Sequence, residues 1–208
     1  MAIITISRGC FNQSKSIANE LAQKIGYKFV AEDWVLGDSI RQNIPEAELI
    51  QEVQSRLSIL DYIEAGEGKH FKKIQASLIK CLLRDDTVYY TVMGQAFLQG
   101  VPHALCVRIV DDPEDRARNL QASLNISMES AQQLTKEEDA ERRRWCYELY
   151  GIDIWESKYY DMVLKSDDFS ADSLVDLIID FIQSGSFETT RDFQKRINRL
   201  AIEAGIDA

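Results

Sequence analysis

The stretch from Gly9 to Ser16 has the residue types and the spacing that bind phosphate. It matches the pattern G-x-x-x-x-G-K-[ST] at every fixed position except Ser14, where the pattern has glycine. A loop of this length folds its backbone N–H groups around an anion, and the helix after it presents its positive N-terminus to the same anion. The predicted phosphate contacts are Gly9, Cys10, Phe11, Asn12, Gln13, Ser14, Lys15 and Ser16.

Lys15 and Ser16 have separate roles in this prediction. Lys15 would reach the β and γ phosphates of a nucleotide, and the Ser16 hydroxyl would ligate Mg²⁺. The alternative is a polar turn in which Ser14 or Ser16 caps a helix. The context favours phosphate binding, because the match lies directly between the first predicted strand and the first predicted helix.

Arginines form the second group of residues with a chemistry of their own. Phosphoryl transfer spreads negative charge over the transferred group, and the planar, always-charged guanidinium of arginine suits that charge. Arg116 and Arg118 follow a predicted strand, and Arg142, Arg143 and Arg144 lie together on a predicted helix. The alternative for this second set is a solvated helix face paired with nearby glutamates.

The elements that position these residues follow from the apolar pattern. Short β-branched and apolar runs predict strands at 3–7, 28–30, 87–93, 104–110 and 161–165. Helices are predicted over 15–25, ended by Gly26, and from Pro113 to about Leu120. A capping box of Thr135 and Glu138 predicts a third helix over 135–150, and Ser170 caps a fourth. The apolar face of this fourth helix is Leu174, Val175, Leu177, Ile178, Phe181 and Ile182.

Two segments differ from this alternation. Residues 38–84 carry charged helical patterns and no convincing strand, which indicates a helical excursion between two core strands. Residues 186–208 are polar and then weakly amphipathic, and we interpret them as an appendage. Elsewhere strands alternate with helices, which predicts an α/β fold with a parallel sheet whose ligands lie beyond the carboxyl ends of the strands.

Composition excludes several classes of protein. The 208 residues hold 24 Lys and Arg against 34 Asp and Glu, a formal charge of −10, which disfavours nucleic acid as a partner. No apolar run approaches the roughly 20 residues of a membrane helix. Four widely spaced cysteines and the lack of a signal peptide at the start predict a cytoplasmic protein. The three tryptophans, Trp34, Trp145 and Trp155, are expected to be packing residues.

The order and spacing of these features resemble the cytidylate kinase-like family of P-loop nucleoside-monophosphate kinases. The likeness is carried by the first strand and its loop, the glycine after the third strand, the two arginine groups and a Tyr-Asp pair before the last strand. The matching residues are Ile4–Gly9, the loop through Ser16, Ile17–Gly26, Val92–Gly94, Arg116, Arg118, Asp139, Arg142, Arg144 and Tyr160–Leu164.

The resemblance implies a three-layer αβα P-loop NTPase fold over residues 1–185, with a five-stranded parallel sheet. It implies a helical acceptor-binding region over 38–84 and a helical lid over 118–150. It also implies ATP as the donor, CMP or a related monophosphate as the acceptor, and Mg²⁺. The catalytic residues would be Lys15, Arg116, Arg142 and Arg144, with the arginines closing on the phosphates.

Acceptor contacts are predicted less directly. Asp33 follows the second strand, where related kinases often place such contacts, and Arg41 and Arg56 supply cations in the helical excursion. For each of them taken alone, the sequence favours the alternative of an ordinary surface charge. Gln95 stands where relatives often carry an arginine. Nucleotides are therefore the predicted partners, and the exposed excursion could also serve in a homodimer.

Two other functions remain open from the sequence. Gln95, and the lack of a carboxylate at the end of the third strand, favour a nucleotide-binding regulatory protein with weak or no kinase activity. The divergent segment 38–84 permits a P-loop kinase that acts on a small molecule other than a nucleotide.

Overall fold

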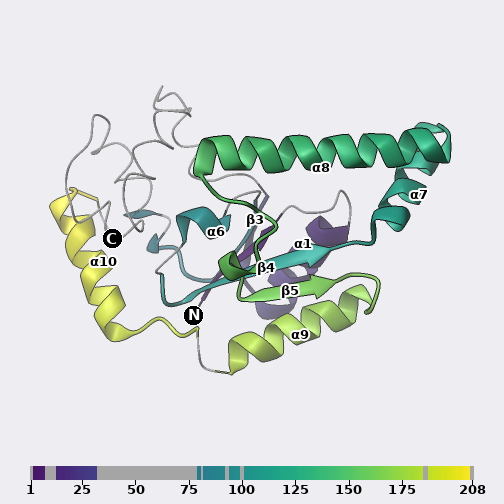
Figure 1. Ribbon diagram of the computed structural model, residues 1–208. Coiled ribbons are helices and arrows are strands. Elements are labelled where there is room, and N and C mark those ends of the chain that lie inside the picture. Colours follow the sequence, from purple (N-terminus) through teal and green to yellow (C-terminus); the bar gives the residue numbers. More distant parts are fainter. Residues whose placement is uncertain are drawn as a thin grey trace.

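The core of the protein is a parallel sheet of five strands, seen here in a computed structural model (Figure 1). The structure describes residues 2–7, 13–31, 79–80, 82–91, 94–98, 101–184 and 187–206. The strand order is β2-β3-β1-β4-β5. The strands are β1 (Ile3–Ser7), β2 (Lys28–Val30), β3 (Thr87–Thr91), β4 (Ala104–Val110) and β5 (Met162–Lys165). The five strands predicted from the sequence and their parallel arrangement are confirmed.

Helices α1 (Gln13–Ile25) and α9 (Ala171–Gln183) cover one face of this sheet. Ile4 and Ile6 of the central strand pack there against Ile17 and Leu21 of α1, with Leu174, Val175 and Ile178 of α9 in the same cluster. The sequence pattern placed Leu177 and Phe181 on this buried face as well, but both side chains are 37% exposed. Gly26 ends α1 with a φ of +74°, as predicted.

The short helix α6 (Gly94–Phe97) approaches the sheet from its carboxyl edge. A Cβ atom at Gly94 would lie 2.7 Å from Thr5 Cγ2 and 2.8 Å from Thr91 Cγ2. Only glycine allows so close an approach between this helix and the two strands. Gly94 therefore begins α6, where the sequence pattern had it end the third strand.

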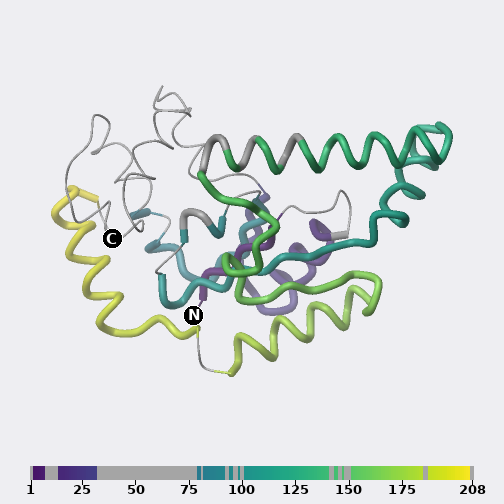
Figure 2. Tube along the Cα trace, viewed as in Figure 1, coloured from purple at the N-terminus to yellow at the C-terminus, as the bar shows by residue number. Residues whose placement is uncertain are grey.

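Helices α7 (Pro113–Leu124) and α8 (Met128–Tyr150) form a packed pair that leaves the sheet at the end of β4 (Figure 2). The prediction of a helix over 135–150 was wrong about where this helix begins. Ser127 is the N-cap, with its hydroxyl accepting from the Ser130 backbone N–H at 3.1 Å. Thr135 lies inside α8, where its hydroxyl donates to the Ala131 carbonyl at 2.9 Å. Gly151 ends the helix with a φ of +62°, as predicted.

The segment after α9 forms a further helix, α10 (Arg191–Glu203), which buries Phe193, Ile197, Leu200 and Ala201. The ring of Phe193 lies 4.3 Å from that of His103, which is itself fully buried before β4. His103 Nε2 lies 3.2 Å from Asp85 Oδ1 without hydrogen-bond geometry, and Asp85 Oδ2 accepts from the Thr189 hydroxyl at 3.0 Å. The C-terminal segment is thus anchored at the amino ends of β3 and β4. None of the described helices is both long and apolar enough to cross a membrane.

Candidate functional site

The first turn of α1 presents Lys15 and Ser16 to solvent directly after the central strand. Ser14 lies in the same turn and is fully buried, and its hydroxyl is 3.2 Å from the Tyr90 hydroxyl of β3. Ser14 is helical, so it needs none of the positive φ that would favour glycine. The side chain at this position therefore points into the core, and the two neighbouring groups remain accessible at the N-terminus of the helix.

Several predicted site residues lie outside the described residues. They are Gly9, Cys10, Phe11 and Asn12 of the phosphate loop, and Asp33, Arg41 and Arg56 of the acceptor set. Gln13 begins α1 and Arg142 lies within α8, but the described part of the structure does not include their side chains. Their predicted roles stay predictions.

Arg116 joins α7 to α8 through a two-pronged ion pair. Its Nη1 and Nη2 donate to the two carboxylate oxygens of Asp139 at 2.7 and 2.8 Å. The Arg116 side chain is 14% exposed and that of Asp139 25%. Such bidentate pairs fix orientation as well as charge. In this conformation Arg116 holds the two helices together, while Arg118 pairs with Asp115 on its own helix.

Arg143 joins α8 to the turn before β5. Its Nε donates to Asp153 Oδ1 at 2.9 Å, and its Nη2 donates to the second oxygen. The guanidinium also lies 4.7 Å from the centre of the Trp155 ring, and the backbone N–H of Trp155 donates to Asp153. The Arg143 guanidinium holds the pKa of the Asp153 carboxyl below its ordinary value, so the pair is charged at neutral pH.

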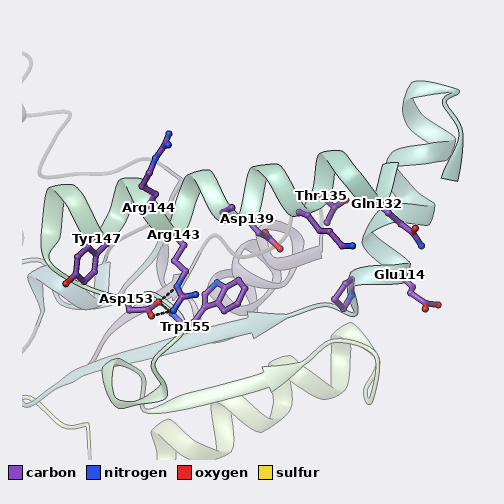
Figure 3. A pocket seen from close by; sticks show the side chains of 12 residues that line it. Glu114, Gln132, Thr135, Asp139, Arg143, Arg144, Tyr147, Asp153 and Trp155 are labelled. Atoms are coloured by element: carbon purple, nitrogen blue, oxygen red, sulfur yellow. Dashed lines mark hydrogen bonds and ion pairs between the residues drawn. The ribbon is translucent and has the colours of Figure 1, made fainter. Parts of the chain in front are cut away.

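A cleft of about 900 Å³ lies between α8, the start of α7 and this turn (Figure 3). One face of α8 lines the cleft, because its lining residues recur every three or four positions along the helix. The lining residues from α8 are Gln132, Thr135, Lys136, Asp139, Ala140, Arg143, Arg144 and Tyr147. Figure 3 shows the indole of Trp155 extending beneath α8. Arg144 is exposed on this helix, but Figure 3 shows its guanidinium directed away from the cleft, whereas that of Arg143 extends toward Trp155.

Gln95, predicted to contact the acceptor, is buried and holds the loop before β5. Its side-chain amide donates to the Tyr160 hydroxyl at 3.1 Å, and that hydroxyl donates to the Ile154 carbonyl at 3.1 Å. Arg108 of β4 donates to the same carbonyl at 2.8 Å, and its guanidinium lies 5.7 Å from the Tyr160 ring centre. This network fixes the backbone next to Asp153 and Trp155.

Sequence reasoning missed three residues of this region. Arg108 is the one charged residue in the run ALCVRIV, and a charge inside an otherwise apolar strand is a signal that could have found it. Tyr160 was noted only for its resemblance to family members. Trp155 was expected to pack in the core, but the structure leaves it 51% exposed. It lies in irregular chain, where apolar periodicity carries no information.

The Tyr160-Asp161 pair has a clear structural role beside the site. Asp161 Oδ2 accepts from the Cys106 backbone N–H at 2.8 Å, and the Asp161 N–H donates to the Cys106 carbonyl at 2.8 Å. These two bonds extend the ladder between β4 and β5 by one residue. The pair therefore starts the last strand in register while Tyr160 reaches Gln95.

The residues present allow Mg²⁺ to arrive with a nucleotide. Mg²⁺ in such sites is held by one or two protein oxygens together with phosphate oxygens and waters. The exposed hydroxyl of Ser16 is suitably placed to be one of those oxygens. Within the described ranges no three His, Cys, Asp or Glu side chains gather into a metal cage. The ion would thus be part of the substrate complex.

The fold and the position of the Lys15-Ser16 pair define a class of protein. A five-stranded parallel sheet, a central strand that leads into a helix with an exposed Lys-Ser pair, and a helical pair over the carboxyl edge are the parts of a P-loop kinase-type α/β fold. Residues 3–168 match the cytidylate kinase-like family, so the chain belongs to this family.

The individual proteins that this chain is similar to have low sequence identity with it. A cytidylate kinase from Methanosphaera stadtmanae is 24% identical over 181 residues, which cover 85% of this chain and 95% of that protein. The crystal structure of an uncharacterized protein from Eubacterium ventriosum has a TM-score of 0.63 at 16% identity and covers 88% of this chain and 98% of its own. Shikimate kinase from Bacteroides thetaiotaomicron has a TM-score of 0.47 at 12% identity, over 88% and 98% of the two chains. Family membership supports a nucleotide kinase in general.

Proposed function

We propose that the protein transfers the γ-phosphoryl group of ATP to a nucleoside monophosphate, with CMP or a close relative as the acceptor. The observation that carries the proposal is the exposed Lys15-Ser16 pair in the first turn of α1, directly after the central strand. A helix N-terminus with an adjacent lysine is a ready site for the phosphates of a nucleotide. CMP as acceptor is supported by the family and by the similarity to a cytidylate kinase.

The chemistry that this site can perform is positioning and charge stabilisation. ATP would supply the transferred group, and Mg²⁺ held in part by Ser16 would neutralise phosphate charge. Lys15 would neutralise charge on the β and γ phosphates, and the arginines of α8 would close on the transferred group. Arg144 is exposed on α8, and its guanidinium would have to turn toward the cleft to take this role. No protein nucleophile is required, because the acceptor phosphate attacks the γ-phosphorus in line.

The test measures ADP formation from ATP–Mg²⁺ with CMP, dCMP, UMP, AMP or GMP as the acceptor. ADP should form with CMP or a close relative, and Lys15→Ala should lower kcat by about 100-fold or more. Lys24→Ala is the matched control, because Lys24 lies at the other end of α1 and pairs with Asp176. ATP binding that is unchanged in Lys15→Ala would overturn the phosphate site itself.

A second candidate function is a nucleotide-binding regulatory protein. The observation that favours it is the hydrogen bond from the Gln95 amide to the Tyr160 hydroxyl. Relatives often carry an arginine at the position of Gln95. The same experiment separates the two functions. ATP binding that depends on Lys15, with no ADP formed from any of the five acceptors, would support regulation in place of turnover.

A further inference from the structure

Trp155 is an unusual surface residue because it is half exposed and yet firmly held. Its side chain is 51% exposed and lines the cleft beneath α8 (Figure 3). Its backbone N–H donates to Asp153 Oδ1 at 3.0 Å, and Asp153 is in turn held by Arg143. The Arg143 guanidinium lies 4.7 Å from the centre of the indole ring, and about half of the residue is still open to water. An ordered, half-exposed indole at a cleft is typical of a surface on which a ligand stacks.

The Trp155 turn is supported from the protein side as well. The Ile154 carbonyl accepts from both Arg108 and Tyr160, at 2.8 and 3.1 Å. Tyr160 is held by the buried amide of Gln95. The neighbouring backbone is therefore fixed before any ligand arrives. A preorganised contact surface loses little conformational entropy on binding, so such a support is what a binding residue needs.

The rest of the cleft complements a ligand that is aromatic at one end and anionic at the other. Arg143 stacks on the Trp155 ring, and the exposed Tyr147 lies one helical turn from Arg143. Lys136 adds positive charge along the same face of α8. Two of the cleft carboxylates, Asp139 and Asp153, are already neutralised by arginines. Lys136 therefore remains to contact a phosphate group, and Glu114 lies at the α7 end of the cleft.

We propose that the cleft holds the base of a nucleotide stacked on Trp155, with the phosphates directed toward Lys136 of α8. This inference rests on the proposed function, because it assigns part of the same nucleotide site. The base could belong to the donor or to the acceptor, since every nucleobase has a face on which an indole stacks. The cleft volume of about 900 Å³ is large enough for a ligand of nucleotide size.

The test compares ligands that have a base with ligands that lack one. Calorimetry measures the Kd of ATP, CMP, tripolyphosphate and inorganic phosphate for the wild type and for Trp155→Leu. Loss of one stacked base should weaken the nucleotide that uses Trp155 by about 5- to 100-fold, while the inorganic anions bind as before. Weakening of ATP alone would assign the donor base, and weakening of CMP alone the acceptor base.

Two further variants make the outcome decisive. Trp155→Phe keeps an aromatic face and should restore most of the lost affinity, which a merely misfolded turn would not do. Far-UV circular dichroism and the unfolding midpoint check the fold of each variant. If Trp155→Leu binds ATP and CMP as the wild type does, or weakens tripolyphosphate equally, the stacking role is overturned. Lys15→Ala tests the proposed function independently of Trp155. If the phosphate site is correct, this variant loses binding of both ATP and tripolyphosphate, whatever Trp155→Leu does.

Discussion

At the scale of single residues, Cys106 shows how burial decides reactivity. It lies in β4 and its thiol is buried beside Thr5. Burial raises the pKa of the Cys106 thiol to about 12, which outweighs the opposite effect of a hydrogen bond with Thr5. The thiol is therefore protonated at neutral pH and is a poor nucleophile.

This predicts that Cys106 resists alkylation in the folded protein. Iodoacetamide at pH 8 should label it at least about 100-fold more slowly than an ordinary cysteine, because the reactive thiolate is so sparsely populated. Peptide mapping by mass spectrometry measures the label at each cysteine, and the same protein in urea provides the reference rate. Rapid labelling of Cys106 without denaturant would contradict its burial.

Some residue roles could be predicted from the sequence and others could not. The Gly9–Ser16 match predicted a phosphate site between the first strand and the first helix. Lys15 and Ser16 are exposed in the first turn of α1, and their phosphate and Mg²⁺ contacts stay predictions. Nothing in the sequence indicated that the Ser14 hydroxyl would lie against Tyr90, or that Gln95 would reach Tyr160. These contacts join residues 76 and 65 positions apart, and local patterns contain no information on such pairs.

At the scale of elements, α8 shows why strands were easier to predict than helix ends. The three central strands, β1, β3 and β4, are buried runs of apolar and β-branched residues, and the shorter edge strands β2 and β5 still carry apolar residues although they are partly exposed. The residues that follow Met128 at the start of α8 are mostly polar, and the Thr135-x-x-Glu138 spacing inside the helix imitates a capping box. Thr135 bonds back to the Ala131 carbonyl, which a threonine in mid-helix can also do.

The start of α8 at Met128, with Ser127 as its N-cap, can be tested by substitution. Ser127→Ala should lower the free energy of unfolding by about 1 kcal/mol, because the backbone N–H of Ser130 loses its capping partner. Glu138→Ala is the control, since a true capping box at Thr135 would make that change costly. Urea unfolding followed by circular dichroism measures both. A larger loss in Glu138→Ala than in Ser127→Ala would return the helix start to Thr135.

At the scale of the whole molecule, α10 lies far from the cleft and packs at the amino ends of the strands (Figure 1). The sequence pattern of 186–208 predicted a polar and then weakly amphipathic appendage, yet Phe187 and four residues of α10 are buried. The periodicity was present, but only the contact with His103 reveals what the helix covers. The segment therefore contributes to the stability of the fold without touching the residues of the cleft.

Phe193→Ala should accordingly destabilise the protein by about 3 kcal/mol or more, the usual effect of emptying the site of a buried aromatic ring. Ile202→Ala is a matched control on the same helix, because Ile202 is 75% exposed and its truncation should change stability by less than about 0.5 kcal/mol. Chemical denaturation of both variants measures the difference. Equal stability of the two would mean that α10 is not anchored through Phe193.

The position of β1 in the middle of the sheet has a consequence for how the protein is made. Its two neighbours, β3 and β4, begin only at Thr87 and Ala104, so the ribosome delivers β1 well before either partner. Until Thr87 has been synthesised the strand has two open edges, which is the state in which nascent chains associate wrongly. Pairing over such sequence distances is also slow. The strand that leads into Lys15 is thus synthesised before both of its neighbours, and it acquires the second only when β4 has emerged.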